Sequence, residues 1–398
     1  MRIAFVTPEY TTEPNFDGGL ANYLHRTALC LHQMGHQPVI VVSSDKNEII
    51  IHEDIEVNRV CINYSKFSKN FINSKPNKFS PTLYCIIQSW YLNERLRKIH
   101  NDKPLNLTQY TNLGGVALFR LSQIPAIIRI SSYTPMINRA YKSRIGLQQN
   151  FWEGLALRRA DGIFSPSKML AKIIQEKTGR LIRVIESPYV MDVTQFDDTL
   201  YDQHLSGKKY LLFFGTIGIL KGVAVVADVI QPILKQYTNL FFVFVGKDVG
   251  TEDGSPMMDY VHKKADTYSD RVIYIDKIPH EQLYPIIKHA QVVVLPSRVD
   301  NFPNTCIEAM ALGKVVVGTF GTSFEQLIIP EKSGFLSEID NASSLQSVVQ
   351  KALDLSEQER ETIGNRARER VAELKPEIVV NQLLNFYQEI LSASKYKA

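Results

Sequence analysis

The sequence predicts an α/β protein made of two facing, doubly wound, Rossmann-like domains with a ligand cleft between them. Apolar runs of strand length alternate with amphipathic helical segments along most of the 398 residues. This alternation lapses over residues 188–208 and then restarts. The length suits two domains of about 100–200 residues each, and the alternation is typical of parallel sheets covered by helices. We therefore expect a first domain over 1–187, a linker over 188–208 and a second domain over 209–375.

The first domain opens with the strand "RIAFVTP", followed by a loop and the helix "LANYLHRTALCLHQM". Leu20, Leu24, Ala28 and Leu31 recur at helical spacing, and Gly35 is a natural helix terminator. The strand "QPVIVVSS" comes next, "IIIHEDIEVNRVCI" indicates short strands, and strand–helix pairs continue to "LIRVIESP".

The second domain repeats the pattern from the strand "YLLFFG" through "FFVFVGKD", "RVIYID" and "QVVVLPS" to "KVVVGTF". Residues 376–398 contain one last helix, which we expect to cross back and pack on the first domain. Ligands of doubly wound sheets bind at the carboxyl ends of the strands, so the cleft between the domains is the expected site.

Composition narrows the function classes. The 45 basic and 41 acidic residues give a net charge of +4, which argues against a dedicated nucleic-acid binder. The four cysteines lie far apart and no metal-ligand spacing occurs, so we expect a reducing cytoplasm and no bound metal. "MRIAFVTPEY" reads as a strand start without a signal-peptide core, and no apolar run approaches the ~20 residues of a membrane span.

A basic stretch interrupts the first domain. Residues 64–80 contain Lys66, Lys69, Lys75 and Lys78 with phenylalanines between them. Such a segment could touch anionic lipid, which would place the protein at the inner membrane face as a peripheral protein. The alternative is a solvated loop, because charge runs usually face water.

The first loop that could take part in ligand binding is "NFDGGLANY". Gly18 and Gly19 let the backbone approach a ligand just before a helix N-terminus, which attracts anions. The third glycine of GxGxxG is missing, so the loop does not support a nicotinamide cofactor. The alternative is a flexible strand–helix connection.

The second loop is "FFGTIGILKGVAVV", where Gly215, Gly218 and Gly222 bracket Lys221 between a strand and a helix. A phosphate at the helix start would meet backbone N–H groups, the helix dipole and the lysine charge. The loop lacks GxxxxGK[ST] and is not a P-loop. The alternative is an exposed lysine beside a glycine.

The third loop is "RVDNFPNTCIEAMALG", which places Asp300 and Glu308 around a strand-to-helix joint. One interpretation is structural: Thr305 and Glu308 fit S/T-x-x-E, a capping box. The other is that Glu308 accepts hydrogen bonds from two ribose hydroxyls while Asp300 contacts a sugar beyond the phosphates. Carboxylates suit this because each offers about four acceptor sites. The local sequence leaves both open.

The order of these pieces resembles that of the retaining nucleotide-sugar glycosyltransferases of the GT-B fold, family four. That family carries two acids separated by seven residues and then Ala-Met-Ala-x-Gly. Here the acids are Asp300 and Glu308, and 309–313 read Ala-Met-Ala-Leu-Gly. The resemblance covers nearly the whole chain, including the C-terminal helix.

The resemblance implies a metal-independent hexosyltransferase without a cofactor. It would move a sugar from a nucleotide-diphosphate donor, UDP favoured and GDP next, to a hydroxyl acceptor in polysaccharide or glycolipid assembly. Glu308 would hold the ribose, Asp300 the donor sugar, and Lys221 the diphosphate. The implied donor contacts further include Gly18, Gly19, Gly215, Thr216, Ile278 near the base, Asn301, Phe302, Pro303, Asn304 and Thr305.

Three positions depart from the family pattern. Asp300 stands where glutamate is commoner, and Thr216 stands where an arginine usually contacts phosphate, so Lys221 or Arg298 must compensate. A histidine near the sugar is replaced in "IIRISSYTP", where Ser131, Ser132 and Tyr133 become the candidate acceptor or sugar contacts. The departures keep two rivals open: a nucleotide-sugar epimerase or hydrolase on the same fold, and a non-catalytic nucleotide-sugar-binding protein.

Overall fold

The computed structural model describes residues 1–14, 19–62, 80–133, 147–191, 193 and 195–395. The chain forms two compact units. Unit 1 holds the described residues up to Val190 together with those from Leu374 onward, and unit 2 holds those within Met191–Glu373.

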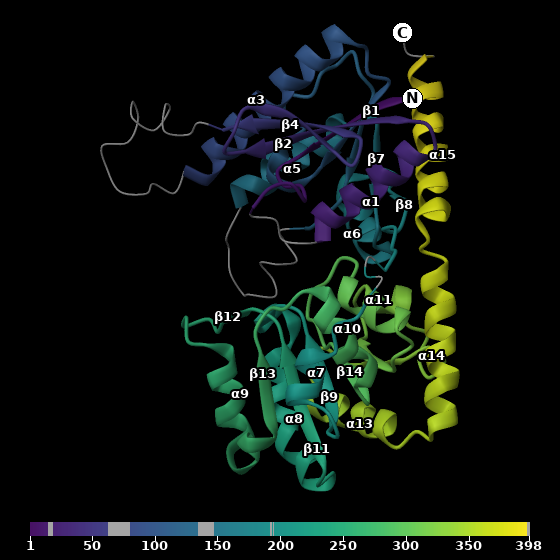
Figure 1. The fold of residues 1–398 in the computed structure, drawn as a ribbon. Helices are drawn as coiled ribbons and strands as arrows, with labels where there is room; N and C mark the ends of the chain where they lie inside the picture. The colour runs from purple at the N-terminus through teal and green to yellow at the C-terminus, as the bar shows by residue number, and fades with distance from the viewer. Residues whose placement is uncertain (15–18, 63–79, 134–146, 192, 194, 396–398) are drawn as a thin grey trace. The chain divides into compact units, whose positions relative to one another are not determined.

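Unit 1 contains a single sheet with helices on both faces (Figure 1). Its elements are β1 (Arg2–Thr7), α1 (Gly19–Gln33), β2 (Gln37–Ser44), β3 (Glu48–His52), β4 (Ile55–Cys61), α3 (Ser80–Asp102), β5 (Leu107–Thr111), the 3-10 helix η1 (Leu113–Gly115), β6 (Ala126–Arg129), α5 (Leu147–Arg159), β7 (Gly162–Ser165), α6 (Lys168–Thr178), β8 (Arg183–Val184) and α15 (Pro376–Lys395).

The sheet of unit 1 has the order β3-β4-β2-β1-β5-β6-β7-β8 and is parallel except for the antiparallel pair β3–β4. Alternate residues of β1 serve two cores, as a parallel sheet buried on both faces requires. Ala4 and Val6 pack with α3, α5 and α6, whereas Ile3 and Phe5 pack with α1 and α15. The strand order reverses between β1 and β5, so the loops after these strands flank the switch point of the sheet.

The C-terminal helix α15 belongs to unit 1. Figure 1 shows it beside α1, and both helices bury apolar side chains in the same core. Gly162 on β7 makes room for it, because a Cβ there would lie 2.9 Å from Phe386 and Ile390 of α15. Tyr387 donates a hydrogen bond to Gln109 of β5 inside this core. The expected return of the last helix to the first domain is therefore what the structure has.

Unit 2 repeats the architecture with a second parallel sheet. Its elements are α7 (Thr199–His204), β9 (Lys209–Phe214), β10 (Ile217–Gly218), the 3-10 helix η2 (Ile219–Lys221), α8 (Val223–Gln236), β11 (Leu240–Val245), β12 (Asp248–Gly250), α9 (Met257–Ala265), the 3-10 helix η3 (Asp266–Arg271), β13 (Val272–Ile275), α10 (His280–His289), β14 (Val292–Val294), α11 (Asn304–Ala311), β15 (Val316–Thr319), α12 (Phe324–Leu327), β16 (Phe335–Ser337), α13 (Ala342–Leu353) and α14 (Glu357–Ala372).

The main sheet of unit 2 has the order β13-β11-β9-β14-β15-β16, and every pair in it is parallel. Leu211 and Phe213 of β9 pack with α8, α9 and α13 on one face. Tyr210 points to the other face, where its hydroxyl donates to the carbonyl of Ile286 in α10 at 2.6 Å. The strand order reverses between β9 and β14, so the loops after these two strands flank the switch point.

The stretch expected as a linker, 188–208, carries local structure. It contains α7, and from Met191 onward it belongs to unit 2. Asp197 fixes this stretch, since its N–H donates to the carbonyl of Glu281 at 2.9 Å and its carboxylate accepts from Gln282 at 2.8 Å. The helix has six residues, none of them buried, so it left no apolar period in the sequence.

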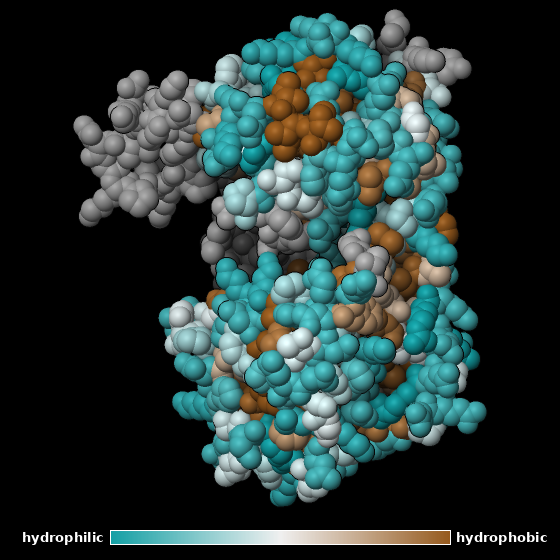
Figure 2. All heavy atoms as spheres, viewed as in Figure 1, coloured by the Kyte–Doolittle hydropathy of each residue, from teal (hydrophilic) through white to brown (hydrophobic). Residues whose placement is uncertain are grey.

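The surface drawn in Figure 2 is mostly hydrophilic, with separate hydrophobic groups on it. Exposed apolar residues include Ile49 and Ile51 on the edge strand β3, which are 57% and 68% exposed. Scattered apolar surface of this kind is normal for a folded chain. In the described part of the chain, no helix combines the length and the hydrophobicity needed to cross a bilayer.

Candidate active site

The loops after β9 and β14 pack directly on each other at the switch point of unit 2. Gly222 has a φ of +74°, and a Cβ there would lie 1.9 Å from the carbonyl oxygen of Pro296. The N–H of Arg298 donates to the carbonyl of Leu220 at 2.9 Å. Only glycine permits both the left-handed backbone and the close approach. The predicted lysine loop and the predicted acidic loop are therefore held together by backbone contacts.

Lys221 and Asp300 form an ion pair across these two loops. The Nζ of Lys221 lies 2.5 Å from Oδ2 of Asp300, and their side chains are 33% and 12% exposed. The backbone carbonyl of Asp300 accepts a hydrogen bond from Ser323 at 2.7 Å, which fixes the start of the acidic loop. The pair places one cation and one carboxylate side by side at the carboxyl edge of the sheet. A phosphate could replace the carboxylate on the ammonium group.

Helix α11 begins at Asn304, with Pro303 in the N-cap position and no side chain capping it. Thr305 therefore lies inside the helix, and the capping-box interpretation of Glu308 is wrong. Glu308 is only 8% exposed. Its Oε1 lies 3.8 Å from Nε2 of His280, the first residue of α10. Glu308 thus faces the segment after β13 that contains the half-buried Ile278, which the resemblance placed near a base.

A glycine also brings the start of α11 close to the end of β9. A Cβ on Gly215 would lie 3.1 Å from Cγ2 of Thr305, and a Cβ on Gly246, after β11, would lie 1.9 Å from the carbonyl oxygen of Gly215. The carboxyl ends of β9 and β11 and the first turn of α11 therefore converge. Thr216, beside Gly215, is exposed. First-turn amides of a helix and an open glycine backbone suit an anion.

The remaining residues of the acidic loop connect Asp300 to the first turn of α11. Asn301 is half-buried, while Phe302 and Pro303 are buried, so the loop between Asp300 and α11 packs against unit 2. The structure brings most of the predicted unit 2 residues to one edge of the sheet.

The guanidinium of Arg298 is already paired with a carboxylate and is therefore not open to a phosphate. Its Nε lies 2.5 Å from Oδ1 of Asp340, so a carboxylate already neutralises the guanidinium. Arg298 also lines a cavity of about 730 Å³ beside η2, together with Ile219 and Tyr260. A phosphate at Arg298 would have to displace Asp340, which leaves Lys221 as the cation at the switch point.

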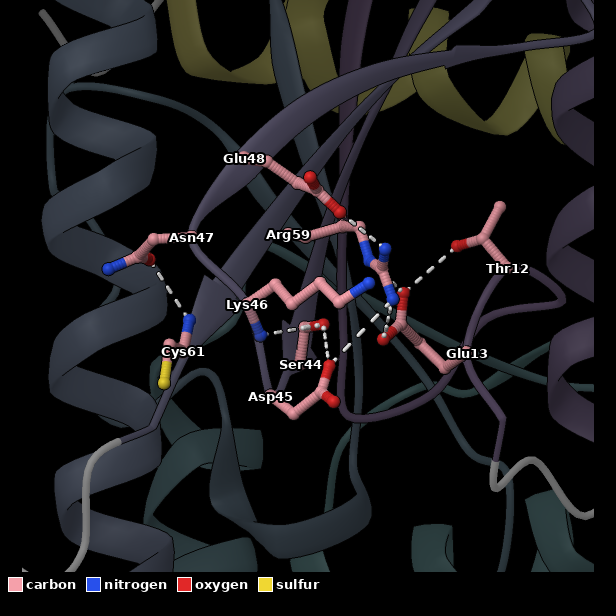
Figure 3. A network of polar contacts seen from close by, with 9 residues as sticks. All are labelled: Thr12, Glu13, Ser44, Asp45, Lys46, Asn47, Glu48, Arg59 and Cys61. Atoms are coloured by element: carbon pink, nitrogen blue, oxygen red, sulfur yellow. Dashed lines mark hydrogen bonds and ion pairs between the residues drawn. The ribbon is translucent and has the colours of Figure 1, made fainter.

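In unit 1, the loop between β1 and α1 is anchored by a buried ion pair, drawn in Figure 3. Arg59 of β4 points at Glu13 of that loop, with Nε–Oε1 at 2.9 Å and Nη2–Oε2 at 3.1 Å. Glu13 is 7% exposed and also accepts a hydrogen bond from Thr12. Asp45, in the turn after β2, and Glu48, the first residue of β3, approach the same guanidinium (Figure 3). The network fixes the chain six residues before Gly19, the first residue of α1.

Ser131, Ser132 and Tyr133 follow β6 at the carboxyl edge of the unit 1 sheet and are half-buried. Asn112, after β5, holds this turn: its Oδ1 accepts from the N–H of Ser131, and its Nδ2 donates to the carbonyl of Ser132, both at 2.7 Å. Tyr133 packs under Lys177, whose Nζ lies 5.2 Å from the ring centroid. Hydrogen bonds and packing therefore fix the conformation of this turn.

Sequence reasoning missed two buried charged residues near this turn. Arg129 is 5% exposed and ends β6, and Glu153 of α5 is 6% exposed. Burial raises the pKa of Glu153 to about 7, although a hydrogen bond with Asn112 and the charge of Lys177 act against the rise. A charge inside the apolar run "AIIRI" was a visible signal, because a buried strand rarely carries one without a reason.

Two predicted features lie outside the described residues: Gly18, and the basic stretch with Lys66, Lys69, Lys75 and Lys78. Within the residues that are described, no group of three or more His, Cys, Asp or Glu side chains could hold a metal ion.

Solved structures share this two-unit arrangement of parallel α/β sheets, which is the GT-B fold. Sucrose-phosphate synthase from Thermosynechococcus elongatus matches with a TM-score of 0.79 at 19% identity, over 98% of this chain and 99% of that one. Anabaena HepE, solved in complex with UDP and glucose, matches with a TM-score of 0.69 at 14% identity, over 98% and 100%. The predicted fold class is confirmed.

Family models match both units. The model for glycosyl transferases group 1 matches residues 201–370, and the model for glycosyltransferase family 4 matches residues 17–189. The two matches together cover most of the chain, so the chain belongs to the group 1 glycosyltransferases. The predicted resemblance to this family is confirmed.

Curated relatives also share only low sequence identity with this chain. The chain is 21% identical over 251 residues to the uncharacterized glycosyltransferase YqgM of Bacillus subtilis, a match that covers 61% of this chain and 65% of that protein. It is 24% identical over 198 residues to CapM of Staphylococcus aureus, a capsular polysaccharide biosynthesis glycosyltransferase, over 50% of each chain. The chain thus spans between half and about two thirds of the length of these relatives.

Proposed function

We propose that this chain transfers a sugar from a nucleoside-diphosphate sugar to a hydroxyl acceptor. The observation that carries the proposal is that three charged side chains gather near the switch point of unit 2. Lys221 pairs with Asp300, and the buried Glu308 on α11 lies beside the segment after β13. One cation for phosphate and two separately placed carboxylates for hydroxyls match the three parts of such a donor.

Each group has a role that its surroundings support. Glu308 accepts hydrogen bonds from the ribose hydroxyls, with His280 and Ile278 at the base end. Asp300 accepts from hydroxyls of the donor sugar. Lys221 and the first-turn amides of α11 receive the diphosphate, whose negative charge grows as it leaves. These dipoles and this cation are fixed before the reaction, so little reorganisation is needed.

The chemical step follows from that placement. The bond between the anomeric carbon and the diphosphate oxygen breaks, and the acceptor oxygen forms a bond to the anomeric carbon on the same face, with retention of configuration. The departing diphosphate takes the acceptor proton. Asp300 positions the sugar and does not become a covalent nucleophile. In this scheme Lys221 and backbone amides meet the diphosphate charge, and no metal ion is required.

UDP is the favoured nucleotide and a hexose the favoured sugar, with GDP next. The support is a neighbour of the same fold, Anabaena HepE, solved with UDP and glucose. Polysaccharide or glycolipid assembly is the favoured setting, and the CapM relative supports it. Such an enzyme would act on the cytoplasmic side of the membrane, where it would meet its nucleotide-sugar substrate. The basic stretch 64–80 would contact anionic lipid.

The test is a thermal-shift panel with UDP, GDP and ADP, followed by incubation with the matching nucleotide sugars. A nucleotide at about 100 times its Kd should add roughly 2.7 kcal/mol of stability. Release of nucleoside diphosphate that depends on an added hydroxyl acceptor supports transfer. Release without acceptor would instead indicate a hydrolase or epimerase. Binding without any release would indicate a nucleotide-sugar-binding protein, and no shift with any nucleotide would contradict the proposal.

A further inference from the structure

Arg129 is a buried cation in unit 1 without a carboxylate partner among the described residues. It is 5% exposed, and its Nη1 and Nη2 donate to the hydroxyls of Ser131 and Ser187, each at 2.9 Å. Its Cζ stacks 3.8 Å from the ring centroid of Tyr23 in α1. The Nε is buried and has no hydrogen-bond partner in the described part of the chain.

The lack of a counter-charge distinguishes Arg129 from Arg59 of the same sheet. The side chain of Arg59 is 10% exposed, and three carboxylates surround it (Figure 3). Tyr23 is the titratable neighbour of Arg129, and burial raises the pKa of its phenol, so at ordinary pH Tyr23 is neutral and supplies no counter-charge. Burial lowers the pKa of Arg129 to about 10, so the guanidinium is charged at neutral pH. An uncompensated buried charge is strongly destabilising.

The position of Arg129 explains why such a charge is useful. Arg129 is the last residue of β6, at the carboxyl edge of the sheet, where ligands of doubly wound sheets bind. Its three contacts come from α1, from the turn after β6 and from the segment after β8. The turn that it supports carries the half-buried Ser131 and Ser132. The positive charge therefore lies directly beneath an accessible turn.

We propose that the carboxyl edge of the unit 1 sheet binds an anionic group, a phosphate, over Ser131, with Arg129 as the positioning residue that supplies the counter-charge from beneath. Two sources of this phosphate fit the chemistry: the diphosphate of the donor and a phosphate carried by the acceptor. The first source rests on the proposed function, whereas the second stands without the donor assignment.

The test uses the full chain and its variants Arg129→Gln and Arg129→Lys. Arg97→Gln serves as the control, because it removes one guanidinium from the exposed surface of α3. Titration calorimetry measures the affinities for UDP, uridine and inorganic phosphate. The phosphate titration is run both with and without saturating UDP. Arg129→Gln should weaken the phosphate-bearing ligand at least 10-fold, and uridine binding should stay unchanged. Arg97→Gln should change none of them by more than about twofold.

The outcomes separate the sources. Weaker UDP binding in Arg129→Gln identifies the donor diphosphate. Unchanged UDP binding, with inorganic phosphate binding to the UDP-saturated protein only when Arg129 is present, identifies a phosphate on the acceptor. If wild type binds phosphate through Arg129 but never binds UDP, the proposed function fails and the anion site stands.

Two results with Arg129→Gln would overturn the inference. One is that UDP and phosphate bind equally well to wild type and Arg129→Gln. The other is that uridine weakens as much as UDP, which would make Arg129 a structural residue. If Arg129→Gln does not fold, Arg129→Lys decides: loss of the planar two-serine contact should weaken phosphate at least threefold, and unchanged affinity would refute the anion site.

Discussion

Replacing Glu308 by glutamine tests the nucleotide site most directly. Glu308 is 8% exposed in α11, and its Oε1 lies 3.8 Å from His280 at the start of α10. Glutamine has nearly the same shape, so packing is conserved, but one acceptor oxygen becomes an NH₂ donor and the charge is lost. A ribose with two hydroxyl donors can then find only one matched acceptor.

The expected loss follows from the hydrogen bonds involved. A hydrogen bond to a charged group contributes about 1.5–3 kcal/mol. Losing one of two such bonds should therefore weaken UDP binding by about 10- to 100-fold, since about 1.4 kcal/mol corresponds to a factor of ten. Titration calorimetry with UDP on wild type and Glu308→Gln measures this, and thermal unfolding of the ligand-free proteins measures any effect on stability.

The matched control is Glu331→Gln, which removes an exposed carboxylate from the same unit; Glu331 pairs at 3.8 Å with the exposed Lys351. It should leave UDP affinity within about twofold of wild type, because exposed pairs contribute little. Equal UDP affinity in wild type and Glu308→Gln, with or without a fall in melting temperature, would refute the ribose contact.

Two further predictions concern charged pairs, and a third concerns a buried carboxyl group. Asp300→Asn frees the Lys221 ammonium, so UDP should bind several-fold more tightly while sugar transfer falls; calorimetry and released UDP measure the two, and weaker UDP binding would contradict the role of the pair. Arg59→Met should lower the free energy of unfolding by about 3 kcal/mol in urea, because it strands the buried Glu13, and adding Glu13→Gln should restore part of the loss. A double variant no more stable than Arg59→Met would count against that pair. Glu153 has a raised pKa of about 7 against its ordinary value of 4.5, so the folded state binds the extra proton. Its stabilising contribution is complete below about pH 4.5 and is lost as pH rises to about 7, so Glu153→Gln should gain stability relative to wild type across that range, by up to about 3 kcal/mol. Parallel pH–stability curves would contradict this.

The sequence was a good guide to the fold because the central strands of both main sheets are parallel and buried. Runs such as "YLLFFG" and "QVVVLPS" are apolar on both faces, which marks central strands without any knowledge of their partners. Boundaries were poorer: the run expected as a strand at "QVVVLPS" gives only Val292–Val294 as β14. The short polar helix α7 was missed because its residues bury nothing.

The sequence pointed to the candidate site residues of unit 2 more directly than to those of unit 1. In unit 2 the candidate residues lie on two short loops with local sequence patterns, and Gly215 and Gly222 are the positions where the backbone approaches its neighbours closely. In unit 1 the relevant contacts join distant residues. Arg59 meets Glu13 across 46 positions, and Arg129 meets Ser187 across 58. No local pattern encodes such pairs, because they depend on the strand order of the sheet.

The ion pair between Lys221 and Asp300 couples two events in the proposed reaction. Without ligand, each charge neutralises the other at 2.5 Å. A donor diphosphate that takes over the ammonium group releases the carboxylate oxygens of Asp300, and the donor sugar brings hydroxyls to occupy them. A nucleoside diphosphate alone takes the ammonium group but leaves Asp300, which is 12% exposed, without a partner. Because an unpaired, nearly buried carboxylate is costly, the intact donor should bind more tightly than the free nucleotide. Asp300→Asn should reduce that preference, since a neutral amide forms no ion pair with Lys221 and costs less to leave unpaired.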